Sequence, residues 1–381
     1  MLSRASVRAF SSSSVAAIKV STRDAPSSTL STLSVVVNNA GSKSGKSGVA
    51  HLLSKFNFLN TETKSALRFT RESELLGGVF STNVTRDAIV LNTQFLKEDL
   101  PYYVEALGNV LAKPSFRPYE FPETVLPVAK AEYDVASSDT TFTALESLHA
   151  LSFRKGYGQP LYYDGARPVS LEEIKQFADD VYTSSNVSVF GSGVNEADLQ
   201  SFISQSAFSS LKEGSSSSSS APASFVGKES RVRSSGKSVA IIGVPVKASE
   251  FSTYELLSTS IGSSALASSA SPLASLPGAA TSKLLKYQDA GLFYVAVSDA
   301  DPSVVASSIK AAKKILTSVT ASDLTKSVKS TKLSLALQST FESPLDIKVE
   351  ASPKADFSFK AASFNYVAVG DIDVLPYADE L

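Results

Sequence analysis

The 381-residue chain contains no cysteine and only two histidines, His51 and His149. The lack of cysteine excludes thiol nucleophiles, cysteine-ligated zinc, iron–sulfur clusters and thioether-linked haem. A histidine-rich metal site, or a haem held by two histidines, would have to use both His51 and His149. The sequence therefore predicts a protein without a cofactor of its own.

Long apolar runs and an excess of one charge are also missing. The most core-like stretch, SVAIIGVPV (238–246), is as long as a strand, whereas a membrane-spanning helix needs about 18–20 apolar residues. The 36 basic and 37 acidic residues leave a net charge of -1, which argues against a surface that neutralises nucleic-acid phosphates. With 43% hydrophobic residues, the chain can fill large cores, so we expect a soluble or membrane-peripheral protein of two or more domains.

The first 23 residues, MLSRASVRAFSSSSVAAIKVSTR, include four basic residues and no acid. Serines are interleaved with apolar residues such as Leu2 and Phe10. This Arg- and Ser-rich, amphipathic pattern is typical of a mitochondrial transit peptide, which we assign to residues 1–16. A disordered tail without a targeting role is the alternative.

A serine-rich segment divides the chain. SSLKEGSSSSSSAPAS (209–224) cannot build a packed element, and with its polar flanks we assign it as a linker over residues 206–236. The same order of elements is predicted on both sides: strand, helix, strand, helix and closing strand. The paired segments are 32–41 and 238–246, 47–56 and 252–261, 87–95 and 291–299, 97–112 and 301–316, and 186–199 and 365–381.

This repetition indicates an internal duplication with a period of about 200 residues. Strands and helices alternate without a glycine-rich phosphate loop, which favours an α+β fold over a nucleotide-binding sheet. We predict two homologous domains, 17–205 and 237–381. Each is expected to be a mixed or antiparallel sheet backed by helices.

One short segment, GVAHLLSKF (48–56), begins like the helix of a zinc peptidase. The H-x-x-E-H motif places two histidines and a glutamate on one helical face. Here His51 occupies the first position, but Ser54 and Lys55 stand where the motif has Glu and the second His.

This segment, the FNFLNT that ends it (56–61), the duplicated halves and the spacing to a helical stretch at 126–138 together resemble the pitrilysin/insulinase family of metallopeptidases. In that family a third zinc ligand, a glutamate, follows from a helix roughly 75–80 residues further on. The resemblance therefore points to Glu132. It runs from about residue 20 to Leu381, with long collinear stretches at 51–61, 67–78, 96–107, 153–183 and 364–381.

Carried over position by position, the resemblance implies a dismantled zinc site. His51 and Glu132 keep two ligand positions, Lys55 replaces the second ligand with a positive charge, and Ser54 replaces the general base. We therefore expect no bound metal and no catalytic residue, with the Lys55 ammonium paired to Glu132 in the metal's place. The alternative is that Lys55 extends into solvent. We expect His149 to be a packed core imidazole.

The resemblance also implies a function. The family includes subunits of the mitochondrial processing peptidase and the core subunits of ubiquinol–cytochrome c reductase, respiratory complex III. Similarity to the latter implies a non-catalytic structural subunit, peripheral on the matrix side of the inner membrane, with core subunit 1, cytochrome b, cytochrome c1, other complex III subunits and a second copy of itself as partners. The alternative is a substrate-binding processing-peptidase subunit, whose flexible glycine-rich loop corresponds to 263–282, a segment with one glycine, Gly278.

Overall fold

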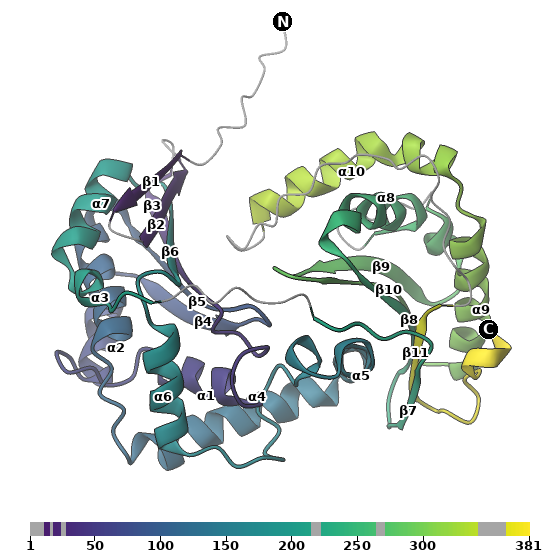
Figure 1. Ribbon diagram of the computed structural model, residues 1–381, viewed down its shortest axis with the longest axis horizontal. Helices are drawn as coiled ribbons and strands as arrows, with labels where there is room; N and C mark the ends of the chain where they lie inside the picture. The colour runs from purple at the N-terminus through teal and green to yellow at the C-terminus, as the bar shows by residue number, and fades with distance from the viewer. Residues whose placement is uncertain (1–10, 16–17, 24–27, 215–221, 264–270, 342–362) are drawn as a thin grey trace, which may run out of the picture. The chain divides into compact units, whose positions relative to one another are not determined.

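The computed structural model describes residues 11–15, 18–23, 28–214, 222–263, 271–341 and 363–381. The chain forms two compact units, the first made of Met1–Tyr133 with Leu161–Ser218 and the second of Asp134–Pro160 with Ser219–Leu381. Each unit is built on one sheet with helices packed against it (Figure 1). Of the predicted transit peptide, residues 1–10 and 16 lie outside the described residues. Residues 11–15 form a strand that pairs with the next one.

The first unit contains a six-stranded sheet with the order β1-β2-β6-β3-β5-β4. Its neighbouring strands are antiparallel except β2 and β6, which run parallel. The strands are β1 Ser11–Val15, β2 Ile18–Arg23, β3 Leu30–Asn38, β4 Val79–Val84, β5 Ala88–Leu96 and β6 Val187–Ser192. The helices are α1 Val49–Phe56, α2 Ala66–Leu75, α3 Leu100–Ala112, α6 Leu171–Val181 and α7 Glu196–Gln205, with short turns η1 Lys97–Asp99, η2 Phe121–Val125 and η4 Ala207–Ser210. Helix α4, Leu126–Ser138, begins in this unit and ends in the second.

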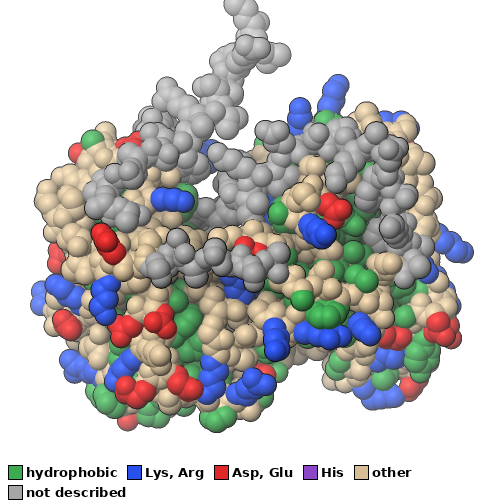
Figure 2. Space-filling model, viewed as in Figure 1, with side chains coloured by type: hydrophobic (Ala, Val, Ile, Leu, Met, Phe, Trp, Pro, Cys, Tyr) green, Lys and Arg blue, Asp and Glu red, His purple; other side chains and the backbone are tan. Residues whose placement is uncertain are grey.

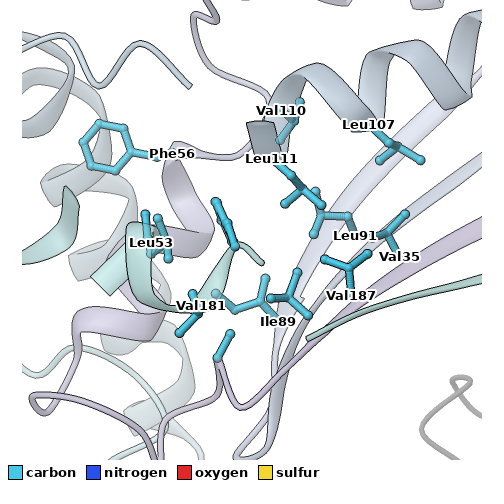
Figure 3. Close-up of a cluster of buried hydrophobic side chains, with 14 of the residues drawn as sticks. Val35, Leu53, Phe56, Ile89, Leu91, Leu107, Val110, Leu111, Val181 and Val187 are labelled. Carbon is cyan, nitrogen blue, oxygen red and sulfur yellow. The ribbon is translucent and has the colours of Figure 1, made fainter. Parts of the chain in front are cut away.

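The core of the first unit lies between one face of this sheet and helices α1, α3, α6 and α7. Alternate residues of the central strands point into it, so Val35 of β3 and Leu91 of β5 meet Leu107 and Leu111 of α3 (Figure 3). Burying each such side chain contributes about 1.5–3 kcal/mol. This packing fixes the position of α1, which carries His51, Ser54 and Lys55.

The second unit contains a five-stranded sheet with the order β7-β11-β8-β10-β9. Its strands are β7 Glu229–Arg233, β8 Ser238–Val246, β9 Ala279–Lys286, β10 Gly291–Asp299 and β11 Asn365–Gly370. Its helices are α5 Thr140–Phe153, α8 Phe251–Ile261, α9 Pro302–Ser318 and α10 Ala321–Phe341, with short turns η3 Gly156–Gly158, η5 Ala248–Glu250, η6 Pro272–Ser275 and η7 Ala378–Glu380.

Both faces of this second sheet are covered. Ala240 and Ile242 of β8 pack with helices α8, α9 and α10, while Val239 and Ile241 face the other way and pack with helix α5. Because successive side chains of a strand point to opposite faces, a strand buried on both sides needs an unbroken apolar run. The sequence SVAIIGVPV is such a run.

The predicted duplication is confirmed by the strand order. Five strands of the first sheet, in the order β2-β6-β3-β5-β4, match the five strands of the second, in the order β7-β11-β8-β10-β9, place by place. The directions agree as well, because β2–β6 and β7–β11 are the parallel pairs and the remaining counterpart pairs are antiparallel. The α+β class and the two sheet-and-helix halves are therefore as expected.

Two boundaries differ from the sequence prediction. Within the predicted linker 206–236, Phe208 is buried in the first core, and Glu229–Arg233 forms strand β7 beside β11. Sequence patterns did not reveal these residues because both lie in polar stretches, and Val232 is the single apolar side chain of ESRVR. In addition, residues 134–160, predicted within the first domain, belong to the second compact unit because α5 packs on β8 and β11.

Among the helices in the described part of the chain, none combines the length and apolarity that a bilayer crossing requires. On the face shown in Figure 2, basic and acidic side chains are interspersed.

The contact between α5 and β8 can be tested by a double-mutant cycle. Leu148 is fully buried, and a Cβ added at Gly243 would lie 2.5 Å from its Cδ2. We expect L148A to cost about 2–5 kcal/mol and G243A about 1–3 kcal/mol. Because L148A removes the atoms with which the new methyl collides, the double variant should be more stable than the sum of the two effects by about 1 kcal/mol or more.

Urea-induced unfolding of the full chain measures all three variants. L151A, at a half-buried position on the same helix, should cost less than L148A. Strict additivity of L148A and G243A would contradict the contact.

Candidate functional site

Helix α1 begins directly after Gly48, at a position that only glycine can occupy. Gly48 has φ +84°, in the left-handed region, and a Cβ there would lie 2.6 Å from the ring of Tyr163. The helix that follows is buried at seven of its eight positions, with only Lys55 partly exposed. The backbone entry and the surrounding core therefore hold the His51, Ser54 and Lys55 side chains in fixed directions.

His51 is completely buried and bonded through both ring nitrogens. The backbone N–H of Tyr163 donates to Nδ1 at 3.0 Å, and Nε2 lies 2.8 Å from Glu132 Oε2. A backbone N–H can only donate, so Nδ1 must be the unprotonated nitrogen and Nε2 carries the proton that is donated to Glu132. The imidazole is therefore neutral, with one defined tautomer.

The expected pairing of Lys55 with Glu132 is present. Lys55 Nζ donates to Glu132 Oε1 at 2.6 Å, while His51 occupies the other carboxylate oxygen. Glu132 comes from α4, the helix predicted at 126–138. The carboxylate thus bridges two side chains of α1 that are one helical turn apart, and the alternative of a solvent-directed Lys55 is wrong, because its side chain is only 15% exposed.

The surroundings shift two of these pKa values. Burial lowers the pKa of His51 and so favours the neutral ring. The hydrogen bond that the ring donates to Glu132 acts in the opposite direction but is outweighed. For Glu132, partial burial alone would raise the pKa, but the hydrogen bonds from Lys55 and His51 prevail and hold it below its ordinary value. The site at neutral pH is therefore a carboxylate between one ammonium and one neutral imidazole.

Ser54 has no free role in this arrangement. Its Oγ donates to the backbone carbonyl of His51 at 2.6 Å, and the side chain is buried. A hydroxyl that donates to its own helix cannot take a proton from water at neutral pH.

A zinc ion does not fit these residues. The two side chains that could bind it, His51 and Glu132, are bonded directly to each other, and the Lys55 ammonium occupies the second carboxylate oxygen. Catalytic zinc needs three protein ligands, and no group of three or more His, Cys, Asp or Glu side chains suited to a metal occurs within the residues that the structure describes.

Sequence reasoning missed the aromatic pair beside His51. Tyr163 supplies the backbone N–H that sets the histidine tautomer, and the ring of Tyr162 lies 4.8 Å from the imidazole, measured between centroids. Both residues lie in the 153–183 stretch that carried the family resemblance. No local motif signals them, because the contribution of Tyr163 is made by its backbone and depends on how a loop returns to α1.

His149 is a packed histidine, as expected. It is 3% exposed in helix α5, with Nδ1 2.7 Å from the carbonyl oxygen of Leu145 and Nε2 2.7 Å from the hydroxyl of Tyr287. A carbonyl can only accept, so Nδ1 carries the proton and Nε2 accepts from Tyr287. Nδ1 is therefore used within α5, and Nε2 links the helix to Tyr287 of the same unit.

The segment compared with a glycine-rich loop, 263–282, is described only in part, since residues 264–270 lie outside the described residues. Its later part forms the turn η6 and the start of β9, and Gly278 has φ +83°.

Comparison with known proteins agrees with this geometry. Residues 19–165 match the family model of insulinase (peptidase family M16), and residues 168–329 match that of the peptidase M16 inactive domain. Among solved structures, the chain resembles the M16 inactive domain protein from Pseudomonas fluorescens (TM-score 0.78, 15% identity, covering 97% of this chain and 99% of that one) and a protease from Helicobacter pylori (TM-score 0.76, 18% identity, covering 95% and 99%). At such low identity, these two structures support the fold alone.

The chain belongs to the insulinase, or M16, family of peptidases and related proteins. Its full-length relatives identify a branch of that family: the mitochondrial cytochrome b-c1 complex subunit 2 proteins of Debaryomyces hansenii, at 62% identity, and of Saccharomyces cerevisiae, at 46% identity. In both comparisons all of this chain and all of the relative are covered.

The charge arrangement at Glu132 predicts a pH dependence. Because the pKa of Glu132 is lowered on folding, the stability that it contributes is fully present above the ordinary carboxyl pKa and is lost as the pH falls through the lower folded value. Wild-type protein should therefore lose more stability than E132Q between pH 6 and about pH 3. Since the Glu132 side chain is 40% exposed, the difference should remain below about 1 kcal/mol.

Urea unfolding at several pH values measures this difference. E123Q removes an exposed carboxylate just before the same helix and should follow the wild-type curve. Parallel curves for wild type and E132Q would argue against the ion pair.

Proposed function

We propose that this protein is a non-catalytic structural core subunit of mitochondrial ubiquinol–cytochrome c reductase, corresponding to core subunit 2 of respiratory complex III. The observation that carries the proposal is the Lys55 ammonium, 2.6 Å from Glu132, in a chain whose full-length relatives are named cytochrome b-c1 complex subunit 2. Because a lysine side chain occupies the proposed metal position, we infer that the protein functions by contacting other subunits and not by catalysis.

The zinc site is interpreted as lost by two replacements. Ser54 stands in place of the general base and Lys55 in place of the second histidine ligand, while His51 and Glu132 remain. The support is geometric, because the side chains of His51, Lys55 and Glu132 meet between α1 and α4 as the three ligands of a zinc site would. Replacing a metal by a lysine keeps the carboxylate neutralised, which explains how the fold retains Glu132 without zinc.

The finer assignments follow from the same proposal. We expect the protein to be peripheral on the matrix side of the inner membrane and to contact core subunit 1, cytochrome b and cytochrome c1, with a second copy of itself across the dimer axis. Electron transfer would belong to its partners, since no redox ligand set is present in the sequence. Interfaces that hold obligate subunits commonly bury about 2,000 Å² or more.

Co-purification tests the proposal. A tagged copy of the chain, expressed in yeast that lacks its own subunit 2, should recover b- and c-type haem absorbance together with the tag, and quinol oxidation by the recovered complex should be unchanged by K55Q/E132Q. Recovery of a catalytic processing-peptidase subunit, without haem, would support the substrate-binding alternative and overturn the core-subunit proposal.

The lost-site interpretation makes a separate prediction. K55H would place histidines at positions 51 and 55 of one helical face, beside Glu132, and so supply three zinc ligands. We expect K55H to bind Zn²⁺ and to gain about 2.7 kcal/mol of stability at a zinc concentration of about 100 times Kd. Wild type and K55M, which loses the charge but adds no ligand, should not respond.

Calorimetric titration and thermal unfolding with and without zinc measure this response. If K55H is as insensitive to zinc as K55M, then the position is not that of a metal ligand and the lost-site interpretation is wrong, whatever the outcome of co-purification.

A further inference from the structure

Positive charge is concentrated on two consecutive helices of the second unit. In a chain with nearly equal numbers of acids and bases, α9 and α10 carry six lysines and a single acid, Asp323. The lysines are Lys310, Lys313, Lys314, Lys326, Lys329 and Lys332. This excess is confined to about 40 consecutive residues, so the positive electrostatic potential is local to these two helices and is not shared by the whole surface.

Helix α10 presents its lysines away from the core. Its buried side chains, Leu324, Ser327, Thr331 and Ser334, recur at helical spacing and face α8. The Ser327 hydroxyl donates to the Leu256 carbonyl of α8 at 3.3 Å. The lysines fall on the opposite side.

All three lysines of α10 are exposed. Lys326, with a side chain 75% exposed, has one ion pair, with Asp323 at 3.3 Å. Asp323 offsets one of the three positive charges, so Lys326, Lys329 and Lys332 still leave α10 with an excess of positive charge.

Two large apolar side chains follow these lysines along the helix. Leu333 is 52% exposed and Leu337 is 36% exposed, and at 100° per residue they lie about two and three turns beyond Lys326 on the same side of the helix. We call Lys326, Lys329, Lys332, Leu333 and Leu337 the lysine–leucine face.

The chemistry of this face distinguishes between two kinds of anionic partner. Protein interfaces are enriched in arginine and aromatic residues and depleted in lysine, yet α9 and α10 contain no arginine, and none of their residues up to Leu337 is aromatic. Lysines together with exposed leucines on one side of a helix are characteristic of helices that lie on an anionic bilayer, with the leucines entering the headgroup boundary and the ammonium groups meeting phosphates.

We propose that the lysine–leucine face of α10 is a docking surface for anionic phospholipid headgroups at a bilayer surface. Lys310 and Lys314 of α9 extend the same positive field. This inference goes beyond the scaffold role and does not depend on it, since the face is defined by its own residues.

The size of the effect follows from the charges. Each lysine near an anionic membrane contributes about 1 kcal/mol, which corresponds to roughly a fivefold change in the partition coefficient. Removing three lysines should therefore weaken binding by about 100-fold at low ionic strength. The loss should shrink as salt shortens the range of the field.

Flotation of the full-length chain with lipid vesicles tests the proposal. Vesicles of phosphatidylcholine alone are compared with vesicles that also contain phosphatidylglycerol or cardiolipin, at low and high salt. Wild type should float with both anionic vesicles and not with the neutral ones, and K326Q/K329Q/K332Q should lose this binding. The matched variant K130Q/K175Q/K212Q, which removes three lysines of the first unit, should bind within about a factor of two of wild type.

The leucines give an independent measurement. L333S/L337S should keep the low-salt binding but lose the part that persists at high salt, because that part comes from apolar insertion. Circular dichroism melting shows that the variants are folded.

Several results would overturn the proposal: equal flotation with neutral and anionic vesicles, equal losses in the two triple-lysine variants, or retention on immobilised polyglutamate without any vesicle binding. The last result would assign the face to an acidic protein partner. Binding to cardiolipin but not to phosphatidylglycerol would support the proposed docking surface and identify cardiolipin as its preferred lipid.

Discussion

A lysine in the last turn of a buried helix needs an anion beside it, and the segments around α1 meet that need. Lys55 lies in α1, whose other seven residues are all buried, and an unpaired charge in such surroundings would be costly. Glu132 supplies the anion, and to do so α4 must pass close to α1. His51 Nε2 donates to the second carboxylate oxygen, and the backbone N–H of Tyr163 donates to His51 Nδ1 on the other side of the ring. One carboxylate therefore fixes two helices and a loop with respect to one another.

Our proposal that the zinc site was lost accounts for the persistence of Glu132. In an active site the metal balances the carboxylate, and its removal without compensation would leave a half-buried negative charge. In the proposed replacement the Lys55 ammonium supplies that balance and requires no change in His51 or Glu132.

Much of this could be predicted from the sequence because it depends on local pattern. The sequence shows the apolar run of β8, the helical spacing of α1 and α3, and the matching strands of the two halves. It also shows the spacing between Lys55 and Glu132 along the chain. The contacts that were missed depend on chain path. The Tyr163 backbone N–H has no sequence signature, and the apolar face of α5 does not reveal which sheet it will cover. Strand β7 was missed because four of its five residues are polar, so the strand has no alternating apolar pattern.

Helix α5 also has a consequence for the order in which the molecule can be completed. Ser152 near its end bonds Asn365 of β11, 213 positions further along the chain. At a synthesis rate of about 5–20 residues per second, the helix emerges roughly 10–40 seconds before that strand exists, although a helix itself forms in about a microsecond. The first strand that Leu148 packs against, β8, follows about 85 residues after the end of α5, so this side chain waits roughly 4–17 seconds for its first partner strand. The apolar face of α5 is therefore covered in stages, first by β8 and last by β11, and the second sheet is complete only when nearly the whole chain has been made.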